Sequence, residues 1–444
     1  MLLQFSIKNF KTFKDKAILS LIASNYDKDT RELDNIYQDD KFNLRILKSA
    51  VIYGANASGK SKFIDALAFM RQFVIKSSKD SQKFEVIAVE PFRLNNESEK
   101  EPTEFEVIFT LKGIHYRYGF EANNKQIVSE WLYYKPKTKE IELFYRDGKK
   151  IETHERNFSK GNTIIKEDLV RENALLVSVA AQFNDAICGS INEWFENLNI
   201  ISGLEEREFK NNTIDKIKSN KEKIKILEFL KAADLGITDI QYEEDTFGLI
   251  PEELKEQIKE LKESIKSYDP DEAFSDISTI HNVYDNDKRK IGKAKFSVLR
   301  DESNGTKKFL YLSGTMIDIL ENGGVLIGDE LDSKLHPNLV CKIVSLFNSK
   351  EFNPKNAQLF FNTHDTNLLS SGLFRRDQIW FTNKDKYGEA KLYSLANFKS
   401  DEVKKNEPFE DNYIRGKYGA IPYLGFFDNL NFNMSQYENE EQKG

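Results

Sequence analysis

The chain has 444 residues, and its 65 Lys and Arg stand against 72 Asp and Glu, which gives a formal net charge of −7. With 39% hydrophobic residues it can build a sizeable core, and its two cysteines, Cys188 and Cys341, lie too far apart in sequence to suggest a disulfide scaffold or a zinc site. The acidic balance argues against a protein whose main task is to hold nucleic acid, because such domains usually carry a basic excess.

The first residues alternate apolar and polar side chains, with Leu3, Phe5 and Ile7 on one face. This pattern is typical of a strand and not of the continuous apolar run of a signal peptide. Nowhere does the sequence approach the roughly 18 consecutive apolar residues of a membrane helix. We therefore expect a cytoplasmic protein without a membrane partner.

Residues 1 to about 150 read mainly as strands. FEVIFTL (105–111), HYRYGFE (115–121) and EWLYYKP (130–136) are aromatic, alternating runs separated by turn residues. This pattern predicts an antiparallel meander.

A strand–loop–helix unit interrupts these strands at 50–75, and its loop, GANASGKS (54–61), matches the phosphate-loop pattern G-x-x-x-x-G-K-[ST] in full. An apolar strand precedes it and a helical pattern follows, which disfavours a chance glycine-rich turn. In such a loop backbone N–H groups and the helix N-terminus face phosphate oxygens, the lysine reaches the β- and γ-phosphates, and the serine hydroxyl coordinates Mg²⁺. We therefore expect bound ATP and Mg²⁺, with the nucleotide held by Gly54, Ala55, Asn56, Ala57, Ser58, Gly59, Lys60, Ser61 and Lys62, and with Ser61 as a metal ligand.

From about 165 to 268 the pattern becomes helical, and PEELKEQIKELKESIKSY (251–268) predicts a charged helix that starts at Pro251. Beyond 275, strands and helices alternate, which predicts a parallel sheet with crossover helices. The expected fold is α/β: a P-loop ATPase with a mixed or parallel sheet, an antiparallel β subdomain and a helical insertion. The expected boundaries are 1–160 for the N-terminal part, 161–275 for the insertion and 276–444 for the C-terminal part.

A second acidic motif follows a short apolar strand in GGVLIGDELDSKLHPNLV (323–340). Alone it could be an exposed acidic turn, but beside a phosphate loop it predicts a catalytic pair. Asp329 is expected to organise Mg²⁺, and Glu330 to act as general base toward the attacking water.

DELDSKLHP, followed some 30 residues later by QLFFNTH, resembles the RecF/OLD branch of the ABC ATPases. The resemblance implies that Asp332 lies in a loop at a dimer interface and that His364 contacts the γ-phosphate. It also implies a Ser-x-Gly signature that completes the ATP site of the opposite subunit. Leu312-Ser313-Gly314 lies inside a helical run, whereas Ser303 and Gly305 open that helix, so we assign the signature to Ser303 and Gly305. Gln72 and Gln82 are both open as the glutamine-loop residue.

The wider sequence resembles the bacterial abortive-infection ATPases, including RloA-like and AbiL-like proteins. The resemblance rests on LLQFSIKNFKTFKD, RENALLVSVAAQFN, RRDQIWF and RGKYGAIPYL. It implies an ATP-hydrolysing sensor or regulator in an antiphage defence module, of the abortive-infection or toxin–antitoxin kind. Such a protein would form a homodimer, or a higher oligomer, through its ATP sites. Asn9, Lys11 and Phe13 become candidates for contacts on the adenine side.

The 80 residues after His364 leave too little room for the nuclease domain of OLD-type proteins, so the effector, a nuclease or toxin, is expected on a separate chain. A RecF-like ATPase that binds DNA directly is the alternative, and a transporter motor fits less well. The candidate DNA-binding lysines and arginines form two groups, Lys216, Lys218, Lys221, Lys223 and Lys225 in one helical run, and Lys288, Arg289, Lys290, Lys293 and Lys295 in another segment. Because runs of charge usually form solvated faces, direct DNA binding is not the favoured prediction.

Overall fold

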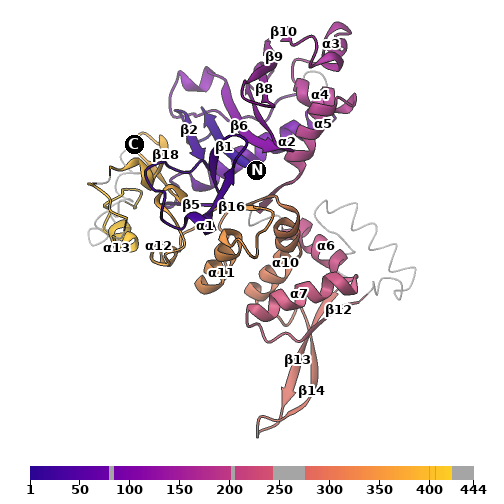
Figure 1. Ribbon diagram of the computed structural model, residues 1–444, viewed down its shortest axis with the longest axis vertical. Coiled ribbons are helices and arrows are strands. Elements are labelled where there is room, and N and C mark those ends of the chain that lie inside the picture. The colour runs from indigo at the N-terminus through magenta and orange to yellow at the C-terminus, as the bar shows by residue number, and fades with distance from the viewer. Residues whose placement is uncertain (80–84, 202–205, 244–275, 400, 406, 423–444) are drawn as a thin grey trace, which may run out of the picture.

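The computed structural model describes residues 1–79, 85–201, 206–243, 276–399, 401–405 and 407–422. An antiparallel sheet with its helices lies at one end, a parallel sheet in the middle, and helices with a projecting hairpin at the other end (Figure 1). The helix predicted at 251–268 and the candidate Gln82 lie outside the described residues. Within the described part of the chain, no helix combines the length and apolar character that crossing a membrane requires.

The strands are β1 (Leu2–Lys8), β2 (Ala17–Ser20), β3 (Ile36–Asp39), β4 (Leu44–Leu47), β5 (Ser49–Gly54), β6 (Thr103–Leu111), β7 (Ile114–Ala122), β8 (Ile127–Lys135), β9 (Ile141–Asp147), β10 (Lys150–Thr153), β11 (Leu198–Ile201), β12 (Asp239–Glu243), β13 (Asp276–Tyr284), β14 (Lys290–Ser297), β15 (Val325–Gly328), β16 (Gln358–Asn362), β17 (Ile379–Lys384) and β18 (Ala390–Ser394). The helices are α1 (Glu32–Asn35), α2 (Lys60–Lys76), α3 (Ser159–Lys166), α4 (Leu176–Gln182), α5 (Ala186–Glu196), α6 (Glu206–Ile217), α7 (Asn220–Ala232), α10 (Asn304–Asn322), α11 (Pro337–Asn348), α12 (Asn367–Ser370) and α13 (Phe409–Ile414).

The central sheet has the strand order β11-β15-β16-β5-β17-β18, parallel except for the antiparallel edge strand β18. All residues of β5, β15 and β16 are buried, as expected of strands covered on both faces. Because these three strands are parallel, their carboxyl ends meet at one edge of the sheet. The phosphate loop, the acidic motif and QLFFNTH therefore come together there, and the predicted α/β class with a parallel sheet is confirmed.

The second sheet has the order β10-β9-β8-β7-β6-β1-β2 and is antiparallel throughout, so the predicted meander is confirmed. Alternate residues of β6 are buried, among them Phe105, Val107 and Phe109. Phe109 stacks on Trp194 of α5 with ring centroids 3.9 Å apart. The alternation thus buries one face of the sheet under the helices.

The segment predicted as a helical insertion, 161–275, is divided between two cores. Helices α4 and α5 pack on α2 and the antiparallel sheet, and β11 forms the edge of the parallel sheet. Glu130 holds α4 in place, because its carboxylate accepts hydrogen bonds from the backbone N–H groups of Leu176 and Val177 at the helix N-terminus. Helices α6 and α7 pack instead on α10. We therefore place the start of the inserted unit after β11.

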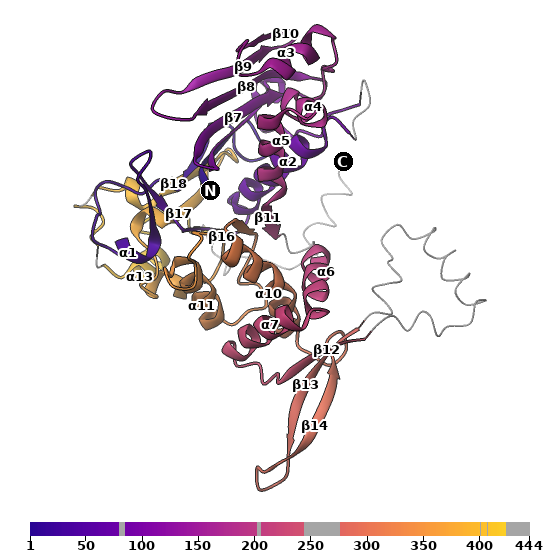
Figure 2. The ribbon, with the colours of Figure 1, turned by 45° about the vertical axis from the view of Figure 1, so that its right-hand side comes forward.

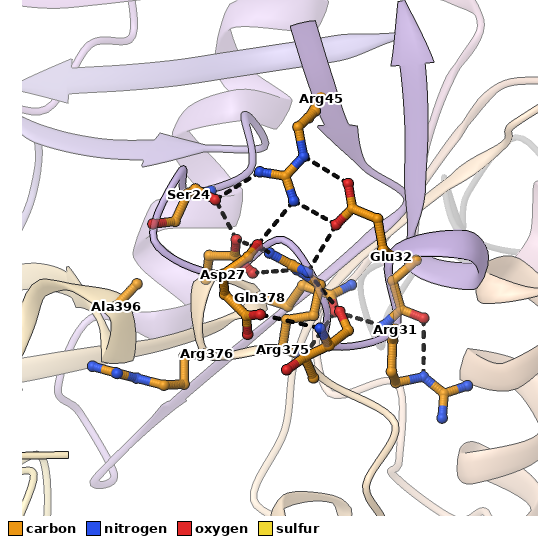
Figure 3. Close-up of polar contacts among 12 residues, drawn as sticks. Ser24, Asp27, Arg31, Glu32, Arg45, Arg375, Arg376, Gln378 and Ala396 are labelled. Carbon is orange, nitrogen blue, oxygen red and sulfur yellow. Dashed lines mark hydrogen bonds and ion pairs between the residues drawn. The ribbon is translucent and has the colours of Figure 1, made fainter. Parts of the chain in front are cut away.

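A buried arginine joins the N-terminal region to the start of β17 (Figure 3). The Arg375 side chain is 0% exposed and donates to both carboxylate oxygens of Asp377 at 3.0 Å. It also donates to the Glu32 carboxylate and to the carbonyl oxygens of Asp27 and Thr30. Residues some 345 positions apart are thereby fixed to one another.

We expect Arg375→Ala to lower the free energy of unfolding by about 3–5 kcal/mol, because it leaves the buried Asp377 carboxylate without its charged partner. Lys405→Ala is the control: its exposed pair with Asp27 is screened by solvent and should contribute much less. Urea unfolding followed by circular dichroism measures both changes. Equal losses in the two variants would contradict the structural role of Arg375.

Candidate nucleotide-binding site

The phosphate loop connects β5 to α2, and two of its glycines are required by the local geometry. A Cβ at Gly54 would lie 2.5 Å from the hydroxyl oxygens of Ser58 and Thr382. Gly59 has φ +113, and a Cβ there would lie 3.1 Å from Thr12 Oγ1. Side chains at these positions would push the loop away from β17 and from the N-terminal segment. Ser58 is engaged with Thr382 at 2.6 Å, so Ser58 anchors the loop to β17.

Lys60 begins α2 and folds back over the loop. Its Nζ donates to the carbonyl oxygens of Gly54 at 2.8 Å and Ala55 at 3.1 Å. Burial lowers the pKa of Lys60 to about 8, although the nearby carboxylates, of which Glu330 has the largest effect, favour its charged form. The ammonium group therefore lies where it can exchange carbonyl partners for phosphate oxygens.

The other predicted loop residues lie around this centre. Asn56 and Ala57 are exposed at the loop, and Ser61 is half-buried in the first turn of α2. Lys62 forms an ion pair with Asp65 at 3.1 Å on the flank of the same helix. This pair engages the Lys62 ammonium group within α2.

Asn362, which the sequence analysis did not select, holds both predicted acidic residues. It ends β16, is 0% exposed, and its Nδ2 donates to Asp329 Oδ1. Its Oδ1 accepts a 2.6 Å hydrogen bond from the backbone N–H of Glu330. Glu330 has φ +54, a left-handed conformation that this bond supports. A polar residue directly after the apolar run LFF (359–361) was the signal in the sequence that could have identified Asn362.

Asp332 and His364 lie beside this pair. Asp332 Oδ2 accepts a long, 3.4 Å hydrogen bond from the backbone N–H of His364. Asp332 Oδ1 is buried and has no hydrogen-bond partner among the described residues. Burial and then the charge of Lys60 lower the pKa of His364, so its imidazole is neutral at physiological pH. The ends of β5, β15 and β16 thus bring Lys60, Asp332 and His364 within electrostatic reach of one another.

Ser303 is the N-cap of α10, as the sequence predicted for the residue that opens this helix. Its Oγ accepts a 3.1 Å hydrogen bond from Thr306 N. A Cβ at Gly305 would lie 2.6 Å from the carbonyl oxygen of Lys334, so the helix start packs on the loop after β15. Among the described residues no hydrogen bond joins Ser303 to the phosphate loop of its own chain. Ser313 lies inside α10 and donates to Leu310 O, which fits its exclusion from the signature.

The N-terminal candidates are engaged elsewhere. The Asn9 amide donates to the carbonyl oxygens of Ser98 and Glu101, Lys11 pairs with an acidic residue of α2, and Phe13 packs in the core. Thr12, which sequence reasoning missed, is the better candidate: its Oγ1 is buried against the loop and has no partner in the part of the chain described.

The two predicted basic groups differ in the structure. The run of five lysines at 216–225 is not one helix, because α6 ends at Ile217 and α7 begins at Asn220. Four of its lysines form close ion pairs: Lys216 with Asp318, Lys218 with Asp215, Lys223 with Asp239, and Lys225 with Glu321. This face is neutralised within the protein. The second group lies on the β13–β14 hairpin and is exposed.

The donor set fits ATP with Mg²⁺. The described residues contain no cluster of three His, Cys, Asp or Glu that could hold a metal alone. Mg²⁺ in nucleotide sites is typically held by one or two protein groups together with phosphate oxygens and water. Ser61 and Asp329 match that requirement, and the loop and Lys60 match the phosphates.

We expect Asn362→Asp to lower ATP turnover by about 10–100-fold while ATP binding persists, since residues that orient a metal ligand typically have effects of this size. The new carboxylate cannot donate to Asp329 and repels it. Gln358→Glu is the control at the other end of β16, where the side chain bonds Leu2 and Leu47 and should affect stability rather than turnover. Steady-state hydrolysis and equilibrium binding separate the effects, and unchanged turnover in Asn362→Asp would contradict the role of Asn362.

ATP affinity should depend on pH through Lys60. Phosphates favour the charged ammonium, so binding above the free pKa of about 8 takes up a proton. Affinity should be level below pH 8 and fall by up to about tenfold per pH unit above it. Titration calorimetry from about pH 7 to about pH 9.5 measures this. The Lys60→Arg variant stays charged over this range, so its ATP affinity should not fall. If the ATP affinity of the wild type does not change over the range, the assignment of Lys60 to the phosphates is wrong.

Residues 49–370 match the sequence profile of the family described as "AAA domain, putative AbiEii toxin, Type IV TA system". No curated protein matches the chain. Solved structures similar to it include the SMC head domain from Thermotoga maritima, with 13% identity, 88% of this chain and 98% of that chain covered, and a TM-score of 0.39. Another is the Smc head domain with a coiled coil and joint derived from Pyrococcus yayanosii, with 11% identity, 88% and 96% coverage, and a TM-score of 0.31. Likenesses this weak say nothing of function.

The family match covers well over half of the chain and contains the phosphate loop, both acidic residues and His364. The chain therefore belongs to this AAA-domain family and is an AAA/ABC-like ATPase of the abortive-infection type, as the resemblance of its motifs implied.

Proposed function

We propose that the chain binds and hydrolyses ATP as a homodimer with composite sites, and that this cycle controls a separate effector in an antiphage defence module in the cytoplasm. The observation that carries the proposal is the meeting of Lys60, Asp329, Glu330 and His364 at one edge of the central sheet, with Asn362 between the strands. The family description, which names a toxin–antitoxin system, supports the regulatory part.

In this proposal each residue has one task. Lys60 leaves the carbonyl oxygens of the loop and holds the β- and γ-phosphates, while Ser61 and Asp329 hold Mg²⁺. ATP supplies the phosphoanhydride bond that is broken. Glu330 accepts the proton of the attacking water, and the imidazole of His364 donates a hydrogen bond to the γ-phosphate.

Two features support a site completed by a second subunit. Ser303 caps the N-terminus of α10, where the helix dipole favours an anion, and it shares no hydrogen bond with its own phosphate loop in the described structure. Asp332 Oδ1 is buried but has no partner in the described chain, as expected of a group that meets another subunit. The γ-phosphate would then lie between Lys60 of one subunit and Ser303 of the other.

The decisive experiment mixes two inactive variants. Lys60→Ala lacks the phosphate-binding charge, and Ser303→Arg blocks the signature. Each should be inactive alone, but heterodimers contain one intact site and one doubly altered site. Mixing should therefore restore up to about a quarter of wild-type turnover, because half of randomly formed dimers hold one such site. Wild-type turnover by Ser303→Arg alone would refute the composite site, since a simple helix cap costs only about 1 kcal/mol of stability.

Glu330→Gln serves as the control for assembly. It keeps the shape of the site but removes the base, so it should bind ATP and accumulate as a dimer without hydrolysis. Light scattering with and without ATP measures this. Coexpression with neighbouring reading frames tests the effector: growth arrest that depends on Lys60 supports regulation, and arrest unaffected by Lys60→Ala contradicts it.

A further inference from the structure

The hairpin formed by β13 and β14 projects away from the rest of the described structure (Figure 2). Its strands pair from Ser278 with Ser297 out to Tyr284 with Lys290, and among the described residues only β12 pairs with it, along β13. A two-stranded hairpin by itself is only marginally stable in water. The extension of β13 and β14 away from the core is therefore not explained by stability and suggests a role in function.

The outer part of the hairpin is basic in an acidic protein. Between residues 284 and 296 there are five cations and only two acids, Asp285 and Asp287, against a net charge of −7 for the chain. The five cations are all exposed: Lys288, Arg289, Lys290, Lys293 and Lys295. Arg289 pairs with Asp287 at 3.5 Å, and both side chains are largely exposed, so the segment keeps an excess of cations over acids at the surface.

Apolar side chains are exposed among these cations. Tyr284 is 55% exposed, Ile291 65% and Phe296 39%. Closely spaced cations suit a chain of phosphates, and exposed aromatic and aliphatic groups between them suit the faces of bases. An acidic protein surface would use the cations but has no comparable need for the interleaved rings.

The hairpin is connected by a short segment to Ser303 and Gly305, the residues assigned to the signature. The N–H of Ser297 donates to Asp301 Oδ2 at 2.7 Å, just beyond β14. Glu302, which immediately precedes Ser303, is held by β13: its Oε1 accepts a hydrogen bond from Thr279 Oγ1 and lies 2.9 Å from His281 Nε2. A shift of β13 therefore acts on the residue that adjoins the cap of α10.

We propose that the β13–β14 hairpin is a nucleic-acid-binding arm, and that Glu302 transmits its occupancy to Ser303. The transmission rests on the proposed function, because it requires Ser303 to contact ATP; binding by the arm does not.

Binding is tested without nucleotide. Fluorescence anisotropy with labelled single-stranded and duplex oligonucleotides compares wild type, Lys288→Glu/Lys290→Glu and the control Lys149→Glu/Lys150→Glu. The control reverses the same number of charges at another exposed hairpin turn. The arm variant should lose at least about tenfold in affinity, and the slope of log K against log salt should flatten by about two for duplex DNA. The control should bind like wild type. The proposed nucleic-acid-binding arm is wrong if the wild type binds no oligonucleotide, or if both variants lose the same affinity. It is also wrong if the hairpin binds only an acidic protein.

Transmission is tested by reciprocity, since a ligand that alters the ATP site must have its own affinity altered by ATP. In the Glu330→Gln background, ATP should change oligonucleotide affinity at least about threefold. Glu302→Ala should remove that change while affinity without ATP persists, and Glu302→Gln, which keeps an acceptor oxygen, should restore it. An ATP effect that survives Glu302→Ala overturns the relay. If ATP does not bind at all, the proposed function fails, and the nucleotide-free measurement still decides the arm.

Discussion

The candidate site depends on the amide of Asn362. The phosphate loop follows β5, but the acidic pair follows β15, and β16 lies between these two strands. A side chain at the end of β16 is therefore well placed to orient the acidic residues toward the loop. Asn362 does this with both ends of one side chain, donating to Asp329 and accepting from the N–H of Glu330. A fully buried amide that satisfies two groups in this way fixes a backbone that would otherwise be strained at Glu330.

Features that depend on residues close together in the chain could be predicted from the sequence, whereas features that depend on contacts between distant segments could not. The phosphate loop, the helix start at Ser303 and the meander are local patterns, so they could be read directly. The same holds for the strand before Asp329. The order of strands in the central sheet is not local, and it decides that Asn362 bridges two strands and that Thr382 supports Ser58. Thr382 belongs to no sequence motif, and QLFFNTH does not indicate which groups its Asn362 bonds. Both residues make contacts between segments that are far apart in the chain.

Whether a charged side chain is paired or exposed was the feature hardest to predict from the sequence. Lys216 and Lys225 looked like part of one solvated face, yet each pairs with an acidic residue of α10 about a hundred positions away. The cations of the hairpin are instead exposed, because its outer part extends beyond the residues of β13 that pair with β12. Runs of basic residues that look alike in the sequence thus form a face neutralised by ion pairs in one place and an exposed basic hairpin in another. The difference comes from tertiary packing on α10.

The start of α10 is tied to the acidic residues of the same chain, and this has a consequence for how two sites would work together. Lys308 of α10 donates to the carbonyl oxygens of Glu330 and Ser333, at 3.1 and 2.9 Å. Gly305 packs against Lys334 so closely that no side chain fits between them. The helix start and the loop after β15 therefore move as one unit. If Ser303 binds the γ-phosphate held by a partner subunit, the same displacement reaches Glu330, which serves the other site. Coupling between the two sites would then follow from packing within each subunit, without any further contact between subunits.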